Sequence, residues 1–171
     1  INDTYIGNQK LSFTPIDDTI QKTYYGWFPQ KIVPYSLQNQ LQDECTKKKL
    51  KETGKVYRYG RKTFKEYEYQ GKKYIQGSYM GNSKKGSITF SDGRTTYSKN
   101  SYIWIEVKPI SWILLDEHRL VSEDILFAME LDKQKDYDGN FENTELSSYL
   151  NGTFLNNIMP DILSEKIEIN I

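Results

Sequence analysis

The chain has 171 residues, which is enough for one hydrophobic core and short for two independent ones. Lys plus Arg and Asp plus Glu both number 23, so the chain as a whole has no net field that would attract a polyanion. We therefore expect a single domain over residues 1–171, no nucleic acid partner and, because no apolar run approaches the roughly 18 residues required, no membrane span.

The numbers of cysteine, tyrosine and alanine residues exclude some kinds of site and favour one kind of secondary structure. Cys45 is the only cysteine, which excludes an intrachain disulfide and a cysteine-based zinc site. Tyr occurs 14 times and alanine once, at Ala128, a composition that favours sheet over helical bundle.

Residues 1–22 predict an N-terminal hairpin. Its strands are Tyr5-Ile6 and Leu11-Ser12-Phe13, and Gly7-Asn8 lies in the turn. A second extended piece follows over residues 24–33. Gly26 there indicates a bulge or a close backbone approach, and Pro29 an edge or an end of the strand.

The next stretch predicts a helix over residues 37–51. Ser36 is its expected N-cap and Gly54 its expected stop. Leu37, Leu41 and Cys45 recur on one helix face. Cys45 is therefore expected in the core, as a small buried residue rather than a reactive thiol.

From Val56 to Tyr97 the pattern changes to short alternating strands. Residues 64–69 and 74–79 predict a hairpin around Gln70-Gly71-Lys72-Lys73. Residues 87–90 and 95–97 predict a second hairpin, with Asp92-Gly93 as a two-residue turn. Tyr alternating with Lys or Arg would suit a stacking platform for sugars or bases, but a half-exposed sheet is the more common origin of this pattern.

The most hydrophobic stretch, residues 102–115, predicts the centre of the fold. It contains Trp104 and Trp112, and its Ile, Val and Trp content favours strand. Pro109 is expected to split it into two pieces, and residues 116–119 to turn the second piece into a hairpin with Leu120-Val121.

The C-terminal part predicts short capped helices. Thr144 or Asn143 caps a helix with Leu146, Tyr149 and Leu150 inward, and Asn151-Gly152 ends it before a second helix. Residues 166–171 alternate as a strand, whose open edge predicts pairing with a second chain. The fold class is therefore α+β, with short-stranded antiparallel or mixed sheets and a few short helices.

One acidic cluster has metal-ligand character. It comprises Asp132, Asp136, Asp138, Asn140 and Glu142 around Gly139, and the calcium candidates are Asp136, Asp138 and Glu142. The spacing fails the EF-hand template, so a solvated turn before a helix is favoured. His118 is the only histidine and lacks a partner nucleophile in a recognisable motif. We therefore nominate no catalytic residue and no cofactor.

Several stretches, in order, resemble an uncharacterised bacterial family, number six-two-seven-three among the domains of unknown function. The resemblance covers about residues 24–160, and its stretches are Tyr25 to Gln30, Tyr74-Ile75, Trp104 to Leu115, Leu120 to Glu123 and Phe141 to Asn156. Phe141 and Tyr149 stand where the family usually has Trp, and the family usually continues past this C-terminus.

The resemblance implies a C-type-lectin-like fold shared with formylglycine-generating enzymes, a domain over residues 23–171 that lacks its C-terminal part, and a secreted or cell-surface bacterial protein. Such fold analogy lends no activity. The favoured function is a non-catalytic binding or structural module with a protein or glycan ligand. The alternatives are a carbohydrate-active or hydrolytic site completed by a missing segment or partner chain, and a calcium-dependent lectin.

Overall fold

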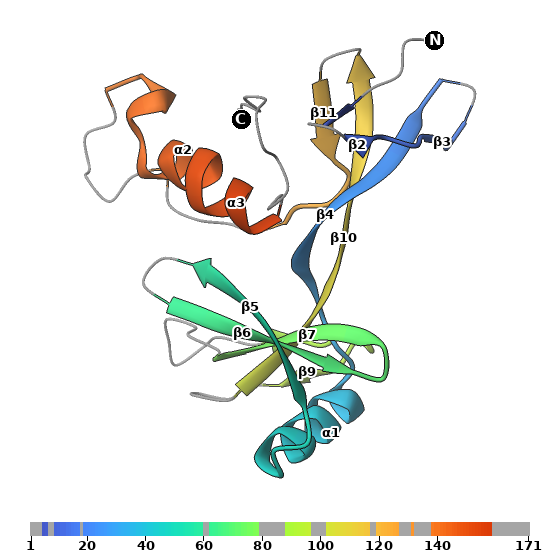
Figure 1. The fold of residues 1–171 in the computed structure, drawn as a ribbon, viewed down its shortest axis with the longest axis vertical. Coiled ribbons are helices and arrows are strands. Elements are labelled where there is room, and N and C mark those ends of the chain that lie inside the picture. The colour runs from blue at the N-terminus through green and yellow to red at the C-terminus, as the bar shows by residue number, and fades with distance from the viewer. Residues whose placement is uncertain are drawn as a thin grey trace. The chain divides into compact units, whose positions relative to one another are not determined.

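A computed structural model gives the fold of the chain (Figure 1). It describes residues 5–6, 9–17, 19–59, 62–78, 88–96, 102–116, 119–126, 131 and 138–158. Two compact units are present: unit 1 comprises residues 1–28 and 109–171, and unit 2 comprises residues 29–108. Helices and antiparallel strand pairs are both present, which confirms the α+β class. The expectation of a single domain stays a prediction.

The two longest strands, β4 (Gln21–Ile32) and β10 (Tyr102–Asp116), run through both units and are neighbours in the sheet. The other elements of unit 1 are β1 (Tyr5–Ile6), β2 (Gln9–Lys10), β3 (Thr14–Pro15), β11 (Arg119–Ser122), η1 (Phe141–Asn143), α2 (Glu145–Tyr149), η2 (Leu150–Phe154) and α3 (Leu155–Ile158). The other elements of unit 2 are α1 (Tyr35–Thr46), β5 (Lys51–Tyr59), β6 (Lys62–Tyr69), β7 (Lys72–Ser78), β8 (Ile88–Thr89) and β9 (Thr95–Thr96).

In unit 1, β3 pairs with β4, and β11 pairs with β10. The inward side chains of β4 and β10 meet the C-terminal helical segment in one core, whose buried members are Leu11, Tyr25, Phe28, Ile110, Leu150 and Phe154. The rings of Phe28 and Phe154 pack edge to face, with their centroids 5.1 Å apart. The N-terminal hairpin is confirmed, although its second strand is β2 rather than residues 11–13.

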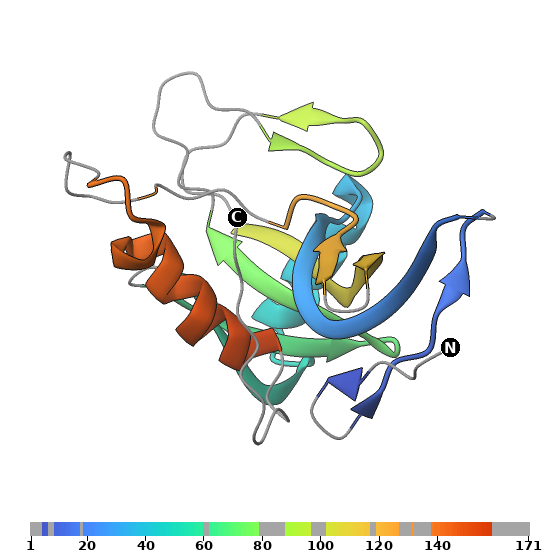
Figure 2. The same cartoon turned by 90° about the horizontal axis from the view of Figure 1, so that it is seen from above.

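The C-terminal helical segment begins as predicted, because the Thr144 hydroxyl accepts a hydrogen bond from the Ser147 amide at 3.1 Å. It does not end at Asn151-Gly152. Instead α2, η2 and α3 follow one another without a break as one continuous helical segment (Figure 2), with π-helical geometry in η2. Leu150 and Phe154 are buried on either side of Gly152, and their packing outweighs the roughly 1 kcal/mol that a glycine costs a helix.

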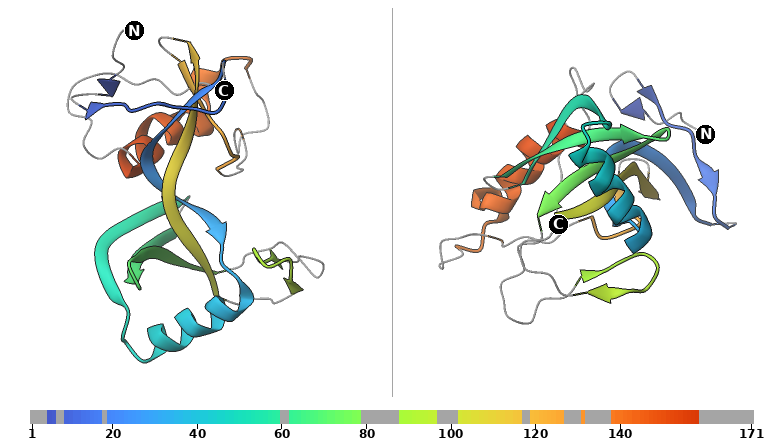
Figure 3. Two further views of the ribbon diagram at one scale, coloured as in Figure 1. Left: turned by 90° about the vertical axis from the view of Figure 1, so that its right-hand side faces the viewer. Right: turned by 90° about the horizontal axis from the view of Figure 1, so that it is seen from below.

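In unit 2, β10 pairs with β7, β7 with β6, and β6 with β5. The β6–β7 hairpin is confirmed, but its turn is shorter than predicted, because Lys72 and Lys73 already belong to β7. The two turn residues, Gln70 and Gly71, both have positive φ, as a two-residue type I′ turn requires. Helix α1 lies against one face of this sheet (Figure 3), where Leu41 packs with Tyr74 and Trp104. The opposite face carries Tyr57, Ile75 and Val107.

The boundaries of α1 differ from the prediction. The helix starts at Tyr35, after Pro34, and ends at Thr46, so Ser36 lies inside it. A residue outside the helix caps its start, since the Tyr35 amide donates to Oδ2 of Asp92 at 3.4 Å. Gly54 lies within β5 at φ 85°, where the register with β6 shifts. The predicted inward face is confirmed: Leu41 is buried, with Leu37 and Cys45 packed beside it.

The β8–β9 hairpin is present, but its turn is longer than predicted. The Phe90 amide donates to the Arg94 carbonyl at 2.8 Å, which leaves Ser91, Asp92 and Gly93 as a three-residue loop. Gly93 takes a φ of 81°, the left-handed conformation expected at the end of such a loop.

Strand β10 is continuous, so the predicted split at Pro109 is wrong. Strand β10 pairs with β7 as far as Val107 and with β11 from Trp112 onwards, on the edge that does not face β4. Pro109 therefore lies where no ladder donor is needed on that side. The predicted centrality of the strand is confirmed, because Trp104 is 0% exposed and Trp112 packs against the core of unit 1. The predicted strand 166–171 lies outside the described residues.

Candidate binding surface

Exposed large hydrophobic side chains concentrate in unit 1. Of the eleven among the described residues, eight belong to unit 1: Ile16, Ile20, Tyr24, Trp27, Leu115, Val121, Ile125 and Leu131. Scattered exposed apolar residues are ordinary, but a group on one sheet is typical of an interaction surface.

Five apolar side chains lie together on one face of the sheet, four of them exposed and Ile113 half-buried. Tyr25 on β4, Trp112 on β10 and Leu120 on β11 all point to the core of unit 1. Because side chains alternate along a strand, their neighbours point away from that core. We call this side the outer face. Its apolar members are Tyr24, Trp27, Ile113, Leu115 and Val121, of which Ile113 and Val121 are cross-strand partners.

Gly26 determines which aromatic residues reach the outer face. Its φ of 73° is in the left-handed region that favours glycine. Along β4 the alternation shifts by one residue at this point, so that Trp27 is 40% exposed and Phe28 only 8%. Without the shift, a regular strand would bury Trp27 and expose Phe28. Two aromatic side chains of β4, Tyr24 and Trp27, therefore both point to the outer face.

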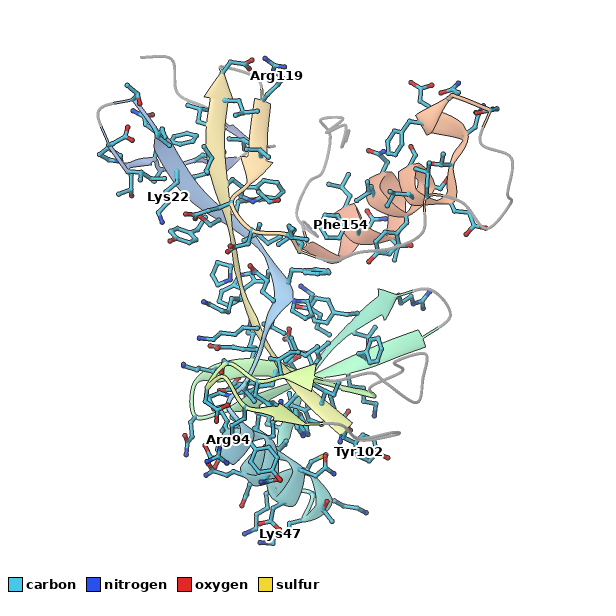
Figure 4. All side chains as sticks on the ribbon, turned by 180° about the vertical axis from the view of Figure 1, so that it is seen from behind. Lys22, Lys47, Arg94, Tyr102, Arg119 and Phe154 are labelled. Atoms are coloured by element: carbon cyan, nitrogen blue, oxygen red, sulfur yellow. The ribbon has the colours of Figure 1, made fainter. Side chains whose placement is uncertain are left out.

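A small polar group accompanies these apolar residues. Lys22 on β4 lies 3.6 Å from Oε2 of Glu123, and the Ser111 hydroxyl of β10 donates to the same carboxylate oxygen. The Ser111 hydrogen bond, with the charge of Lys22, lowers the pKa of Glu123. The Lys22 ammonium also lies 5.5 Å from the centre of the Tyr24 ring, and hydrogen bonding to Tyr24 raises the pKa of Lys22. Figure 4 labels Lys22 on β4 and Arg119 at the start of β11.

The predicted calcium candidates do not come together as a described site. Asp136 lies outside the described residues, and so does Asp132. Asp138 holds a turn, accepting from the Asn140 amide and the Asn143 side chain at 2.8 Å each, and these bonds lower its pKa. Glu142 is exposed in η1. In the part of the chain that the structure describes, three or more metal-ligating side chains do not group anywhere.

Unit 2 contains one buried carboxylate. Glu66 is 2% exposed, and its two oxygens accept from the Thr53 hydroxyl at 2.8 Å and the Tyr57 hydroxyl at 2.7 Å. Burial and the charge of Glu66 raise the pKa of Tyr57. Because both oxygens have hydroxyl donors, this cluster ties β5 to β6 rather than presenting a reactive group.

Cys45 lies on the predicted inward face of α1, but it is less buried than predicted. It is half-buried beside Tyr67, and burial raises the pKa of its thiol, which keeps it protonated near neutral pH. His118 lies outside the described residues.

Comparison with known proteins adds no relative. The chain matches no protein-family model, no curated protein and no solved structure. Across the described ranges, the helices are too short or too polar to cross a membrane.

Sequence reasoning missed the outer face. The sequence predicts an extended piece over residues 24–33 and the centre of the fold over residues 102–115, but it assigns no side chain of either stretch to an outward face. The alternation of Lys22 and Tyr24 with Thr23 and Tyr25 was the available signal, because it separates two faces on β4.

Proposed function

We propose that the protein is a non-catalytic binding module and that the outer face of unit 1 binds another protein. The observation that carries the proposal is the group of outward apolar side chains on β4, β10 and β11, with Leu115 at 59% and Val121 at 42% exposure. Burying such side chains contributes about 25 cal/mol per Å² of apolar surface, which favours association.

A protein ligand suits this surface better than a glycan does. Three of the five apolar members, Ile113, Leu115 and Val121, are aliphatic. Glycan sites rely on aromatic faces and hydrogen-bonding groups, whereas aliphatic side chains match the apolar centre of a protein interface. The Lys22–Glu123 pair would form part of a polar rim, where an exposed ion pair adds specificity more than affinity.

The family resemblance is compatible with this proposal. A C-type-lectin-like module of a bacterial secreted or surface protein would be expected to act by binding. The support is the order of the quoted sequence stretches and the α+β architecture, and the C-type-lectin-like assignment remains part of the proposal.

Two matched variants test the outer face. Val121→Glu places a charge on the outer face, and Val56→Glu places one on β5 of unit 2 at a valine of almost equal exposure, 39%. We expect bacterial proteins retained by the immobilised wild type to be retained by V56E and lost from V121E. The retained protein, once purified, should bind wild type in calorimetry at least about tenfold more tightly than V121E, because a charge must then be desolvated at the interface.

The proposal fails if V121E and V56E behave alike while both keep the wild-type circular dichroism spectrum. Glycan binding is the second candidate, favoured by the outward pair Tyr24 and Trp27 beside Lys22, Ser111 and Glu123. A glycan array that shows binding by wild type and V121E, abolished in Tyr24→Ala, would favour it over the protein ligand.

A further inference from the structure

The charge of the chain is divided unequally between the two units. Unit 2 contains 17 Lys and Arg against seven Asp and Glu, a net charge of +10. Unit 1 contains six Lys and Arg against 16 Asp and Glu, a net charge of −10. The overall neutrality is therefore the sum of two opposite charges, and it does not exclude a polyanion as a ligand of unit 2.

The surplus of unit 2 lies on its surface. Five described acidic residues are each paired with a basic one, in the pairs Lys47–Asp43, Lys51–Glu68, Lys65–Glu52, Lys72–Glu106 and Arg94–Asp92. A sixth, Glu66, is buried with hydroxyl donors. Five exposed basic residues have no acidic partner within 4.0 Å among the described residues: Lys31, Lys48, Lys49, Arg58 and Lys108.

The unpaired basic residues are spread over several elements rather than gathered in a pocket. Lys48 and Lys49 lie just beyond α1, whose C-cap Lys47 is labelled in Figure 4, while Arg58 lies on β5 and Lys108 on β10. A positive surface of this kind suits a long flexible polymer with a charge on every unit, because its affinity comes from released counterions rather than from one contact.

Exposed aromatic rings in the same unit favour single-stranded nucleic acid among such polymers. Tyr102 is 60% exposed at the start of β10, and Tyr35 is 38% exposed with the Arg94 guanidinium 5.6 Å from its ring centre. Bases stack on such rings without regard to sequence. We infer that unit 2 binds single-stranded nucleic acid through its phosphates, without reading the base sequence.

Fluorescence anisotropy of the full chain with a labelled single-stranded DNA of about 30 nucleotides tests this inference, because such a strand spans several phosphate contacts. The test variant is Lys48→Gly with Lys49→Ser. Lys48 has a φ of 57°, so glycine removes its charge in a conformation that glycine favours. The matched control, Lys133→Ser with Lys135→Ser, removes two lysines from unit 1.

We expect wild type and the control to bind with the same affinity within about twofold, since charges outside the contact surface add little at moderate salt. For K48G/K49S the affinity in about 50 mM salt should fall about tenfold or more. The slope of log affinity against log salt concentration should become shallower by about 1.4, because each lost phosphate contact on a single strand removes about 0.7. Strands of different base composition should bind alike. Equal losses in the control, or no binding by wild type, would overturn the inference.

A further outcome would reassign the surface. If wild type binds no oligonucleotide but self-associates reversibly with salt in sedimentation, and K48G/K49S does not, the ligand of unit 2 is the acidic unit of a second copy and the inference is wrong. The inference is independent of the proposed function, because V121E should bind the oligonucleotide as wild type does.

Discussion

Glu66 illustrates how a charged residue is held within unit 2. Its side chain points to the sheet face of Ile75, its cross-strand neighbour on β7, where water is excluded. A buried carboxylate is costly unless its oxygens are hydrogen-bonded, and here Thr53 and Tyr57 of β5 supply the donors. Thr53 lies within the register shift of β5 and Tyr57 follows it, so this irregular part of the strand supplies both hydrogen-bond donors to the buried carboxylate.

The first prediction concerns Tyr57→Phe. At pH 7 the variant should be less stable by about 1–2 kcal/mol, because one oxygen of Glu66 loses its donor. The folded-state pKa of Tyr57 is raised, so its stabilising contribution is complete below the unfolded pKa near 10 and declines as pH rises above it. The gap between wild type and Y57F should therefore narrow by about 1.4 kcal/mol at pH 11.

Urea unfolding of both proteins at the two pH values measures this effect. The other tyrosines titrate in both proteins and cancel in the difference. A gap that stays constant between pH 7 and pH 11 would show that the ionisation of Tyr57 is not coupled to folding.

At the scale of elements, helix α1 is hydrogen-bonded to strand β10 through the side-chain amides of Gln38 and Gln42. The buried Gln38 accepts from the Trp104 amide at 2.7 Å and donates to the Trp104 carbonyl at 2.8 Å. It therefore contacts the strand as a neighbouring peptide group would, just beyond the end of β4 at Ile32. One turn later, the carbonyl oxygen of Gln42 accepts from the Trp104 indole at 3.2 Å and from Gln76 at 2.9 Å.

The second prediction is that Gln38→Met lowers the free energy of unfolding by about 2–3 kcal/mol. Methionine keeps the volume but leaves the buried Trp104 amide without its acceptor, and such groups cost about 1–3 kcal/mol each. Asn39→Ala is the control, since Asn39 is exposed on the same helix and should change stability by less than about 0.5 kcal/mol. Equal effects of Q38M and N39A in urea unfolding would show that the amide pairing contributes nothing.

At the scale of the whole molecule, the two units are connected by shared strands. The chain passes between them inside β4, at Phe28 and Pro29, and inside β10, at Lys108 and Pro109. Each unit has its own buried cluster on these strands, with Ile110 in unit 1 and Trp104 in unit 2. Loss of either strand would remove pairing partners in both units, which predicts that they unfold together.

Hydrogen exchange of the wild-type chain measures this third prediction. The slowest backbone amides of β7 in unit 2 and of the β10–β11 pair in unit 1 should report the same opening free energy, to within about 1 kcal/mol, as expected for one cooperative unit. A clearly lower opening free energy in one unit would show two domains instead of the single domain expected from chain length.

The amino-acid sequence by itself determined the local elements, because they depend on short-range rules. Period-two alternation on both sides of residues 70–73 predicted the β6–β7 hairpin, and the recurrence of Leu37, Leu41 and Cys45 predicted the buried face of α1. Of the two candidate caps that the sequence offered, Asn143 and Thr144, it is Thr144 that begins the C-terminal helical segment.

Only the tertiary structure decided what depends on partners distant in the sequence. Packing of Leu150 and Phe154 carried the helical segment through Gly152, and the change of partner along β10 accommodated Pro109. The outer face and the opposite charges of the units became visible only once residues far apart in the chain were assigned to one surface or one unit. The physical reason is that burial and electrostatic potential are sums over neighbours in space, whereas turns, caps and periodicity are properties of neighbours along the chain.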